Sequence, residues 1–309
     1  MAHPLLIKSI GLALNAWSLL QPDRATRQAF RLFTRPPRPR LRAKELSFLK
    51  TGERRDTRHA GRPVVEYHWG PAGPTIYLAY GWGYNAGRWR HFIPQLVEAG
   101  FRVIAYDPPG HGQAPSGQLH LVENAAIIQS LIHTYGRPWA VIGHSFGGAA
   151  SVLALADLPE AQQPERLVIM ASFSDAMQVF RVFQRTLGLS ERLFWRFVRY
   201  MEQRAGASMS AFDLAPLSGR RLGHLPVLLV HDPEDEVTPF QHARRYHAFW
   251  PGSALLPAPG AGHHLGRASV TQAVIDYVLR GAVPAEAEVQ QHALPAQHDL
   301  VRFFAQLEG

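Results

Sequence analysis

From residue 46 onward, short apolar runs alternate with longer segments whose apolar residues recur at helical spacing. The short runs predict buried strands and the longer segments predict helices. Buried strands that alternate with helices are typical of a mostly parallel sheet with helices on both faces, so we expect an α/β fold. Strands are expected at 46–49, 64–69, 75–80, 103–106, 139–143, 167–171, 227–230 and 254–256, the first two at a sheet edge, and helices at 89–99, 122–135, 146–158 and 269–279.

The segment at 173–223 interrupts this alternation. It is long, aromatic and basic, and it predicts helices at 176–187 and 191–204. An insertion of this size between two buried strands is typical of a lid over a site, so we expect a helical cap. Its apolar side chains predict an apolar pocket, and they are Phe180, Phe183, Leu187, Phe194, Trp195 and Phe197.

The first 45 residues lie outside this pattern. A mostly apolar run at 5–20 contains Lys8 and is shorter than the ~20 residues that a membrane-spanning helix needs. Its helical spacing predicts an amphipathic helix, carried by Ile7, Ile10, Leu14 and Trp17. We expect this helix to pack on the main domain, with peripheral contact to a membrane surface as the alternative.

The chain therefore divides into four parts. Residues 1–45 are predicted to form the N-terminal helix and a basic extension, and 46–172 with 224–281 the core. Residues 173–223 are predicted to form the cap and 282–309 a C-terminal extension.

Composition and charge restrict the classes of site and partner that the protein can have. The absence of cysteine excludes disulfides and a cysteine nucleophile, and the 16 scattered histidines show no H-E-x-x-H spacing, so we expect no metal. The formal net charge is +8, with basic residues concentrated between Arg24 and Arg58. We interpret this run as a solvated, partly ordered segment and expect no nucleic-acid partner. We expect a cytoplasmic protein, with membrane association through the N-terminus as the alternative.

A G-x-S-x-G motif at 143–147 carries the strongest chemical signal. It follows the apolar run at 139–142 and opens a predicted helix. This strand–turn–helix context exposes a serine hydroxyl above the sheet, with a helix N-terminus beneath it. The glycines are needed because side chains there would collide with neighbouring backbone. Ser145 is therefore predicted to be a nucleophile.

A serine nucleophile needs a base and an acid that orients the base, and after such a motif the acid precedes the histidine along the chain. The loop after the run at 227–230 contains four acids. Asp235 is predicted to be the orienting acid, because it lies where the loop turns back toward the site. We expect a turn at Asp232, solvent exposure for Glu234 and Glu236, and Asp175 as the alternative acid.

The base is expected in the glycine-rich loop after the last predicted strand. This loop contains Gly262-His263-His264. One ring nitrogen of the base must reach the serine while the other meets the acid. His263, directly after Gly262, is the predicted base, and His264 is the alternative.

The negative oxygen that forms in acyl transfer needs hydrogen-bond donors already in place. One predicted donor is the backbone N–H of Phe146, which follows the nucleophile. The other is the backbone N–H of Trp82, in the glycine-rich loop after the run at 75–80. We also expect the side chains of Trp82 and His144 to line the substrate pocket.

Together these motifs resemble the α/β-hydrolase family over residues 46–279, through 80–83, 107–112, 143–147, Asp235 and Gly262-His263. The resemblance implies an eight-stranded, mostly parallel sheet, a cap after the sixth strand and a Ser-His-Asp triad that uses no cofactor. In such relatives the loop that binds the negative oxygen usually begins His-Gly, and the histidine braces it. This chain has Tyr80-Gly81, so we expect different bracing but the same backbone donor.

The leading functional prediction is hydrolysis of a small-molecule carboxylic ester through an acyl-enzyme intermediate. A thioesterase or a C–C bond hydrolase would use the same triad. A dehalogenase or epoxide hydrolase fits less well, because those relatives use a carboxylate nucleophile. A non-catalytic ligand-binding protein on the same scaffold is the alternative from another class.

Overall fold

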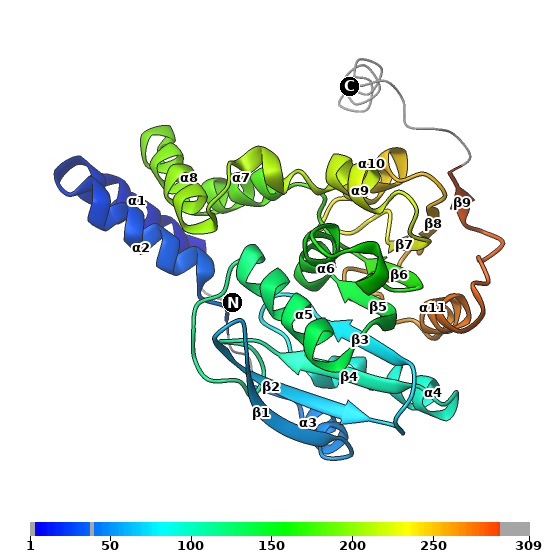
Figure 1. The fold of residues 1–309 in the computed structure, drawn as a ribbon. Helices are drawn as coiled ribbons and strands as arrows, with labels where there is room; N and C mark the ends of the chain where they lie inside the picture. The colour runs from blue at the N-terminus through cyan, green and yellow to red at the C-terminus, as the bar shows by residue number, and fades with distance from the viewer. Residues whose placement is uncertain (1–3, 38–39, 291–309) are drawn as a thin grey trace.

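The computed structural model describes residues 4–37 and 40–290. Its centre is a nine-stranded sheet in the order β1-β2-β4-β3-β5-β6-β7-β8-β9 (Figure 1). Neighbours from β4 to β8 pair in parallel, whereas the pairs β1–β2, β2–β4 and β8–β9 are antiparallel. The strands are β1 (Glu53–His59), β2 (Arg62–Trp69), β3 (Thr75–Ala79), β4 (Arg102–Asp107), β5 (Pro138–His144), β6 (Arg166–Met170), β7 (Val227–His231), β8 (Ala254–Pro257) and β9 (Glu288–Val289).

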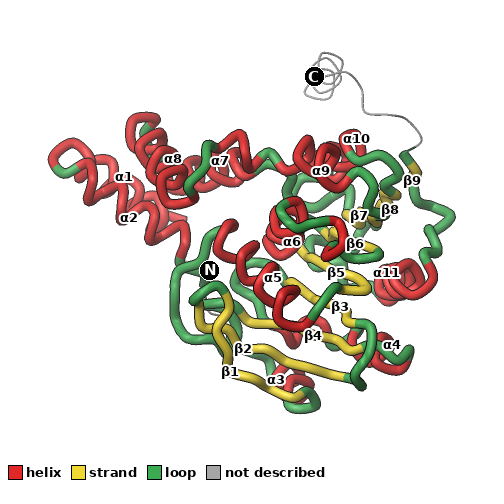
Figure 2. The backbone as a smooth tube through the Cα atoms, in the orientation of Figure 1, coloured by secondary structure: helices red, strands yellow, loops and turns green. Residues whose placement is uncertain are grey.

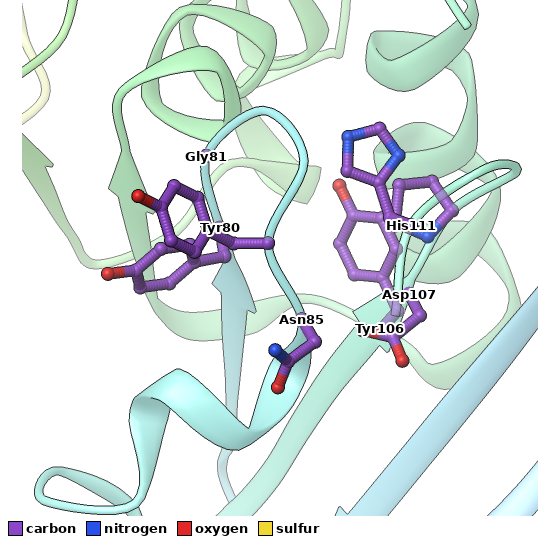
Figure 3. A pocket seen from close by; sticks show the side chains of 8 residues that line it. Tyr80, Gly81, Asn85, Tyr106, Asp107 and His111 are labelled. Atoms are coloured by element: carbon purple, nitrogen blue, oxygen red, sulfur yellow. The ribbon is translucent and has the colours of Figure 1, made fainter. Parts of the chain in front are cut away.

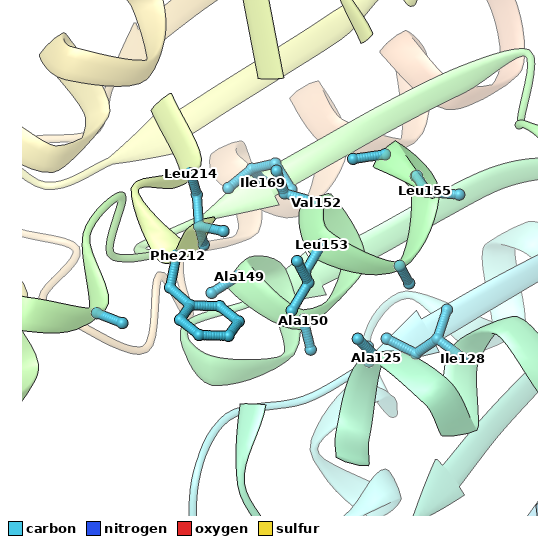
Figure 4. Packing of buried hydrophobic residues seen from close by; sticks show 14 of the residues in the cluster. Ala125, Ile128, Ala149, Ala150, Val152, Leu153, Leu155, Ile169, Phe212 and Leu214 are labelled. Atoms are coloured by element: carbon cyan, nitrogen blue, oxygen red, sulfur yellow. The ribbon is translucent and has the colours of Figure 1, made fainter. Parts of the chain in front are cut away.

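Helices cover both faces of this sheet, which confirms the predicted fold class. One apolar cluster joins the sheet to α5 (Leu121–Tyr135), α6 (Phe146–Ala156), α9 (Leu214–Leu222) and α10 (Gln241–Phe249). A second joins the other face to α3 (Ala43–Leu49), α4 (Ile93–Glu98) and α11 (Ala268–Arg280). Figure 4 shows Ala149, Ala150 and Leu153 of α6 among side chains from α5, β6 and the segment before α9. Small residues on α6 let these elements approach closely.

Three local predictions are wrong. The apolar run at 46–49 is not an edge strand but the end of helix α3, whose Glu45 carboxylate accepts the backbone N–H of Arg42 at 3.0 Å. The edge strand is β1, which the sequence analysis missed because its sequence, ERRDTRH, is charged and largely solvent-facing. The run at 64–69, expected at an edge, belongs to β2, which pairs with both β1 and β4 and is therefore an interior strand. The helix expected at 89–99 divides into the 3₁₀ turn η1 (Ala86–Trp89) and α4, which begins next to Pro94. Proline favours the first turn of a helix.

The helices predicted at 176–187 and 191–204 are present as α7 (Ala176–Leu187) and α8 (Glu191–Ala205), the segment for which the sequence predicts a cap. Two N-terminal helices lie against them, α1 (Pro4–Leu20) on α7 and α2 (Pro22–Thr34) on α8. Figures 1 and 2 show these four helices as a group beside the sheet, and we call them the four-helix unit. The basic segment that begins at Arg24 is therefore an ordered helix over 22–34, so the expected partial order is wrong there. Its basic side chains Arg24, Arg27 and Arg31 are exposed to solvent, as expected.

Aromatic packing explains why α2 is ordered. The ring of Phe33 on α2 meets those of Phe180, Phe183 and Phe197 edge-on, with centroids 5.0, 5.1 and 5.4 Å apart. Phe30 is also buried, beside Tyr200. Edge-to-face aromatic pairs stabilise a contact beyond the area that they bury. The aromatic side chains of α7 and α8 thus pack against α2. Trp195 differs, because it is 42% exposed.

The C-terminal segment adds the ninth strand, which the resemblance to eight-stranded relatives did not imply. β9 pairs with β8 through Val289 and Glu288 and so covers that sheet edge. The rest of the expected extension, 291–309, lies outside the described residues.

Candidate active site

Ser145 lies on a tight turn between β5 and α6. Its backbone has φ 52° and ψ −121°, a left-handed conformation that is strained for a residue with a side chain. A Cβ at Gly143 would lie 2.6 Å from Gly148 Cα, and one at Gly147 would lie 2.3 Å from the Ala79 carbonyl oxygen. The motif needs glycine at both positions because backbone occupies the space of a side chain.

The structure brings Ser145, His263 and Asp235 into one hydrogen-bonded row. His263 Nε2 lies 3.1 Å from Ser145 Oγ, and His263 Nδ1 lies 2.8 Å from Asp235 Oδ2. The side chain of Asp235 is fully buried, and that of His263 is 12% exposed. Because the Nδ1 proton is held by Asp235, Nε2 is left as the acceptor for the serine proton.

Several donors hold Asp235 as a carboxylate. Its Oδ1 accepts the backbone N–H groups of Val237 and Thr238 at 2.8 and 3.0 Å. Burial opposes ionisation, but the hydrogen bonds from His231, His263 and the Thr238 N–H hold the pKa of Asp235 well below its ordinary value. His231 was missed by the sequence analysis. The sequence feature that could have indicated this role was a histidine four residues before the acid.

The other candidate acids do not contact the His263 ring, although the carboxylate of Asp232 accepts the backbone N–H of the adjacent Gly262. Asp232 makes a turn, since its carboxylate accepts the N–H of Glu234 at 2.9 Å, and Glu234 and Glu236 are exposed. Asp175 caps α7 by accepting the N–H of Met177 at 2.8 Å.

The neighbouring histidines have other partners. His264 Nε2 lies 2.9 Å from the hydroxyl of Tyr84. His144 is buried and donates from Nε2 to the carbonyl oxygen of His263 at 2.7 Å, so it supports the loop that carries His263. Burial, with the nearby His263, lowers the pKa of His144 to about 3, so this ring is neutral.

Of the two expected backbone donors, Phe146 directly follows Ser145 in the chain, and Trp82 directly follows Gly81, which lies close to Ser145. Phe146 begins α6, and the first N–H groups of a helix have no acceptor within it. The loop of Trp82 touches the serine, because a Cβ added to Gly81 would lie 3.1 Å from Ser145 Cβ. The Trp82 ring is half-buried and meets the Phe146 ring edge-on at 5.0 Å.

Asp107 fixes the far end of this loop, a role that the sequence analysis did not assign. It is fully buried at the end of β4 and accepts the backbone N–H groups of Ala86 at 2.7 Å and Gln113 at 2.9 Å. Burial raises its pKa to about 6 although these bonds oppose the shift. The available signal was an acid at the end of a buried strand.

Two cavities lie beside the loop that begins at Tyr80 and Gly81. The first, about 10 Å³, is lined by Tyr80, Asn85, Asp107 and His111. In Figure 3, Tyr80 and His111 lie on opposite sides of the backbone between Gly81 and Asn85. The second, about 190 Å³, has His144, Tyr80, Arg88 and His264 in its wall. His144 thus lines the second cavity, together with Tyr80.

No group of three or more His, Asp or Glu side chains within 4–37 and 40–290 is placed to hold a metal ion. The arrangement offers a serine hydroxyl, a histidine ring nitrogen within hydrogen-bond distance of it, and backbone N–H groups close by. These features, at the carboxyl edge of a parallel sheet, define the class of α/β proteins with a nucleophile on a strand–helix turn. A model of the Alpha/beta hydrolase family matches residues 76–276, and the chain belongs to that family.

Curated relatives match parts of this chain. A pimeloyl-[acyl-carrier protein] methyl ester esterase of Methylococcus capsulatus is 34% identical over 89 residues, which cover 29% of this chain and 34% of that protein. A monoglyceride lipase of Rattus norvegicus is 28% identical over 103 residues, which cover 30% of this chain and 34% of that protein. The chain thus spans about a third of the length of these relatives.

Solved structures share the fold. Est1E from Butyrivibrio proteoclasticus, solved with ferulic acid bound, aligns with a TM-score of 0.57 and 18% identity over 73% of this chain and 98% of that one. At this identity, the likeness shows the fold alone.

Proposed function

We propose that this protein is a serine hydrolase that cleaves carboxylic esters through an acyl-enzyme. The row from Ser145 Oγ through His263 to Asp235, with distances of 3.1 and 2.8 Å, carries the proposal. Ser145 attacks the ester carbonyl while His263 takes the hydroxyl proton and passes it to the leaving alcohol. Water then attacks the acyl-enzyme, gives a proton to His263 and frees the acid, and His263 returns that proton to Ser145.

The backbone N–H groups of Phe146 and Trp82 would bind the negative oxygen of both tetrahedral intermediates. Their positions, one at the start of α6 and one in the loop that touches Ser145, support this role. One such donor accounts for about 3–4 kcal/mol of transition-state stabilisation in a serine protease.

An ester is favoured over an epoxide or a haloalkane because the residue on the turn is a serine rather than a carboxylate. Two of the relatives, a methyl ester esterase and a monoglyceride lipase, support the same class. The paired rings of Trp82 and Phe146 beside Ser145 favour an apolar substrate group. A thioester or a C–C bond next to a carbonyl would react by the same steps.

Labelling with a fluorophosphonate probe tests the proposal. We expect wild type to be labelled, Ser145→Ala to be unlabelled and His263→Ala to be labelled much more slowly. His264→Ala is the matched control and should keep labelling, because its ring meets Tyr84 rather than Ser145.

Turnover of p-nitrophenyl esters of increasing chain length, beside acyl thioesters, then ranks the substrate classes. Turnover that persists in Ser145→Ala contradicts the mechanism. A folded wild type with neither labelling nor turnover favours a binding protein.

A further inference from the structure

One face of α1 consists of large apolar side chains that no described part of the chain covers. The exposed fractions are 71% for Leu5, 55% for Leu6, 69% for Leu12, 38% for Trp17, 69% for Leu19 and 84% for Leu20. We call these six residues the α1 outer face. Contiguous apolar surface of this kind marks an interaction site, whereas single exposed leucines do not.

The opposite face of α1 is fixed to the cap, so the outer face cannot rotate inward. Leu14 is buried against Leu187 and Leu193. A Cβ on Gly11 would lie 1.7 Å from the carbonyl oxygen of Leu187, which shows how closely the two backbones approach.

Polar contacts also hold α1 against the end of α7. Lys8 Nζ donates to the Arg185 carbonyl oxygen at 2.7 Å. Asn15 donates to the Gly188 carbonyl oxygen at 2.8 Å and accepts the Ser190 N–H at 2.9 Å. Lys8 is thus the one charged residue of α1, and its ammonium group is held at the cap side.

The four-helix unit, taken together with Arg35 directly after α2, has a net charge equal to that of the whole protein. Residues 4–35 contain five basic and one acidic side chain, and residues 176–205 contain six and two, so their net charge is +8, equal to that of the chain. Two of the three acids, Asp23 and Glu191, are ion-paired with Arg196 and Arg181. The three helices that accompany α1 in this unit therefore present exposed arginines, which include Arg24, Arg27 and Arg31 on α2, Arg185 on α7, and Arg192 and Arg199 on α8.

We infer that the α1 outer face docks on an anionic lipid bilayer. An apolar helix face with flanking cations is what an interfacial helix uses, with leucines among the acyl chains and arginines at the lipid phosphates. No helix in the described part of the chain is long and apolar enough to cross a membrane, so α1 lies along the surface. A second copy of the protein fits less well, because it would bring two +8 units together.

The four-helix unit is also joined to the loops of the candidate active site through the segment that follows α2. The segment after α2 reaches the loops of the site, where a Cβ on Gly83 would lie 2.8 Å from Pro37 and one on Gly110 would lie 2.6 Å from Pro36. An ester carried by the bilayer is then the natural substrate class. This last consequence rests on the proposed function, whereas docking itself does not.

Sedimentation of the full chain with vesicles tests the docking. We expect binding to phosphatidylcholine vesicles that contain phosphatidylserine, weaker binding to phosphatidylcholine alone, and weakening by salt. The Leu12→Gln/Leu19→Gln variant should lose about tenfold or more in partitioning. Leu46→Gln/Val283→Gln, which changes two exposed apolar residues outside α1, is the matched control and should bind like wild type.

Charge and activity are tested separately. Arg24→Gln/Arg27→Gln/Arg31→Gln should lose most of the preference for phosphatidylserine, at about fivefold per charge, whereas Arg220→Gln/Arg221→Gln on α9 should keep it. Ser145→Ala should bind like wild type, so the docking can fail or hold independently of the hydrolase proposal.

Wild type that leaves both vesicle types unbound overturns the docking. Equal loss in the Leu46/Val283 control also overturns it. A dimer in analytical ultracentrifugation that Leu12→Gln/Leu19→Gln converts to a monomer, without vesicle binding, assigns the face to a second copy instead.

Discussion

The ring of Tyr80 stacks on the ring of His144, with centroids 4.6 Å apart and planes 23° apart. His144 in turn donates to the carbonyl oxygen of His263 at 2.7 Å. The loop that touches Ser145 and the loop that carries His263 are therefore joined through two rings. A tyrosine can hold this loop by stacking, where a histidine would hold it by hydrogen bonding.

This contact predicts that the ring of Tyr80 matters and its hydroxyl does not. Tyr80→Phe keeps the stack, so we expect ester turnover within about twofold of wild type. Tyr80→Ala removes an aromatic pair worth about 0.5–1.5 kcal/mol and leaves a void, so we expect turnover to fall about tenfold or more. Steady-state kinetics on a short ester measures both. Equal losses in the two variants would show that the hydroxyl carries the effect.

Gly81 is predicted to be essential because of its neighbours. An alanine Cβ there would lie 3.0 Å from His144 Nδ1 and 3.1 Å from Ser145 Cβ, so the loop must shift outward. We expect Gly81→Ala to lower kcat by about tenfold or more, since a displaced donor no longer reaches the negative oxygen. Gly266→Ala, with nothing within 4 Å of the added Cβ, should keep activity. Full activity in Gly81→Ala would remove the loop from the mechanism.

Asp235→Asn tests the orienting acid. The amide cannot hold the His263 Nδ1 proton as a carboxylate does, so the ring loses its productive tautomer, and kcat should fall about 10⁴-fold. Glu234→Gln and Glu236→Gln change exposed acids of the same loop and should leave kcat within about twofold. A small effect of Asp235→Asn would mean that another group orients the base.

A buried carboxylate away from the site should control acid stability. Glu66 is fully buried and accepts from His68 Nε2 at 2.6 Å and from the hydroxyls of Thr57 and Tyr135 at 2.7 Å, with His59 as a further partner. Burial raises the pKa of Glu66, but hydrogen bonds from His59 and His68 outweigh it and hold the pKa well below the ordinary 4.5.

Because the pKa of Glu66 is lower in the folded state, its contribution to stability is present above pH 4.5 and is lost as the pH falls below it. We expect the free energy of unfolding of wild type to fall between about pH 5 and pH 3. Glu66→Gln should be less stable at neutral pH by about 1–3 kcal/mol and should show a flatter acid slope. Urea unfolding across this range measures both, and Glu98→Gln, at an exposed position, is the control. An unchanged acid slope in Glu66→Gln would contradict the assignment.

Local patterns in the sequence were enough to predict the centre of the fold. The turn at Ser145 follows from G-x-S-x-G between an apolar strand and a helix, because each glycine meets backbone within a few residues or in the adjacent strand. The buried parallel strands follow from their apolar runs, and α7 and α8 from their spacing. The run at 46–49 shows the limit, since four apolar residues suit a strand or the end of a helix equally.

Tertiary structure alone decided the contacts between distant segments. Phe33 meets Phe180 across more than a hundred residues, and Tyr80 meets His144 from a different strand. Side-chain type predicts that such residues will be buried, but not beside which partner. Likewise, α1 turns Leu14 inward and Leu12 outward because Gly11 and Asn15 fit the end of α7, a geometry that exists only after the cap has folded.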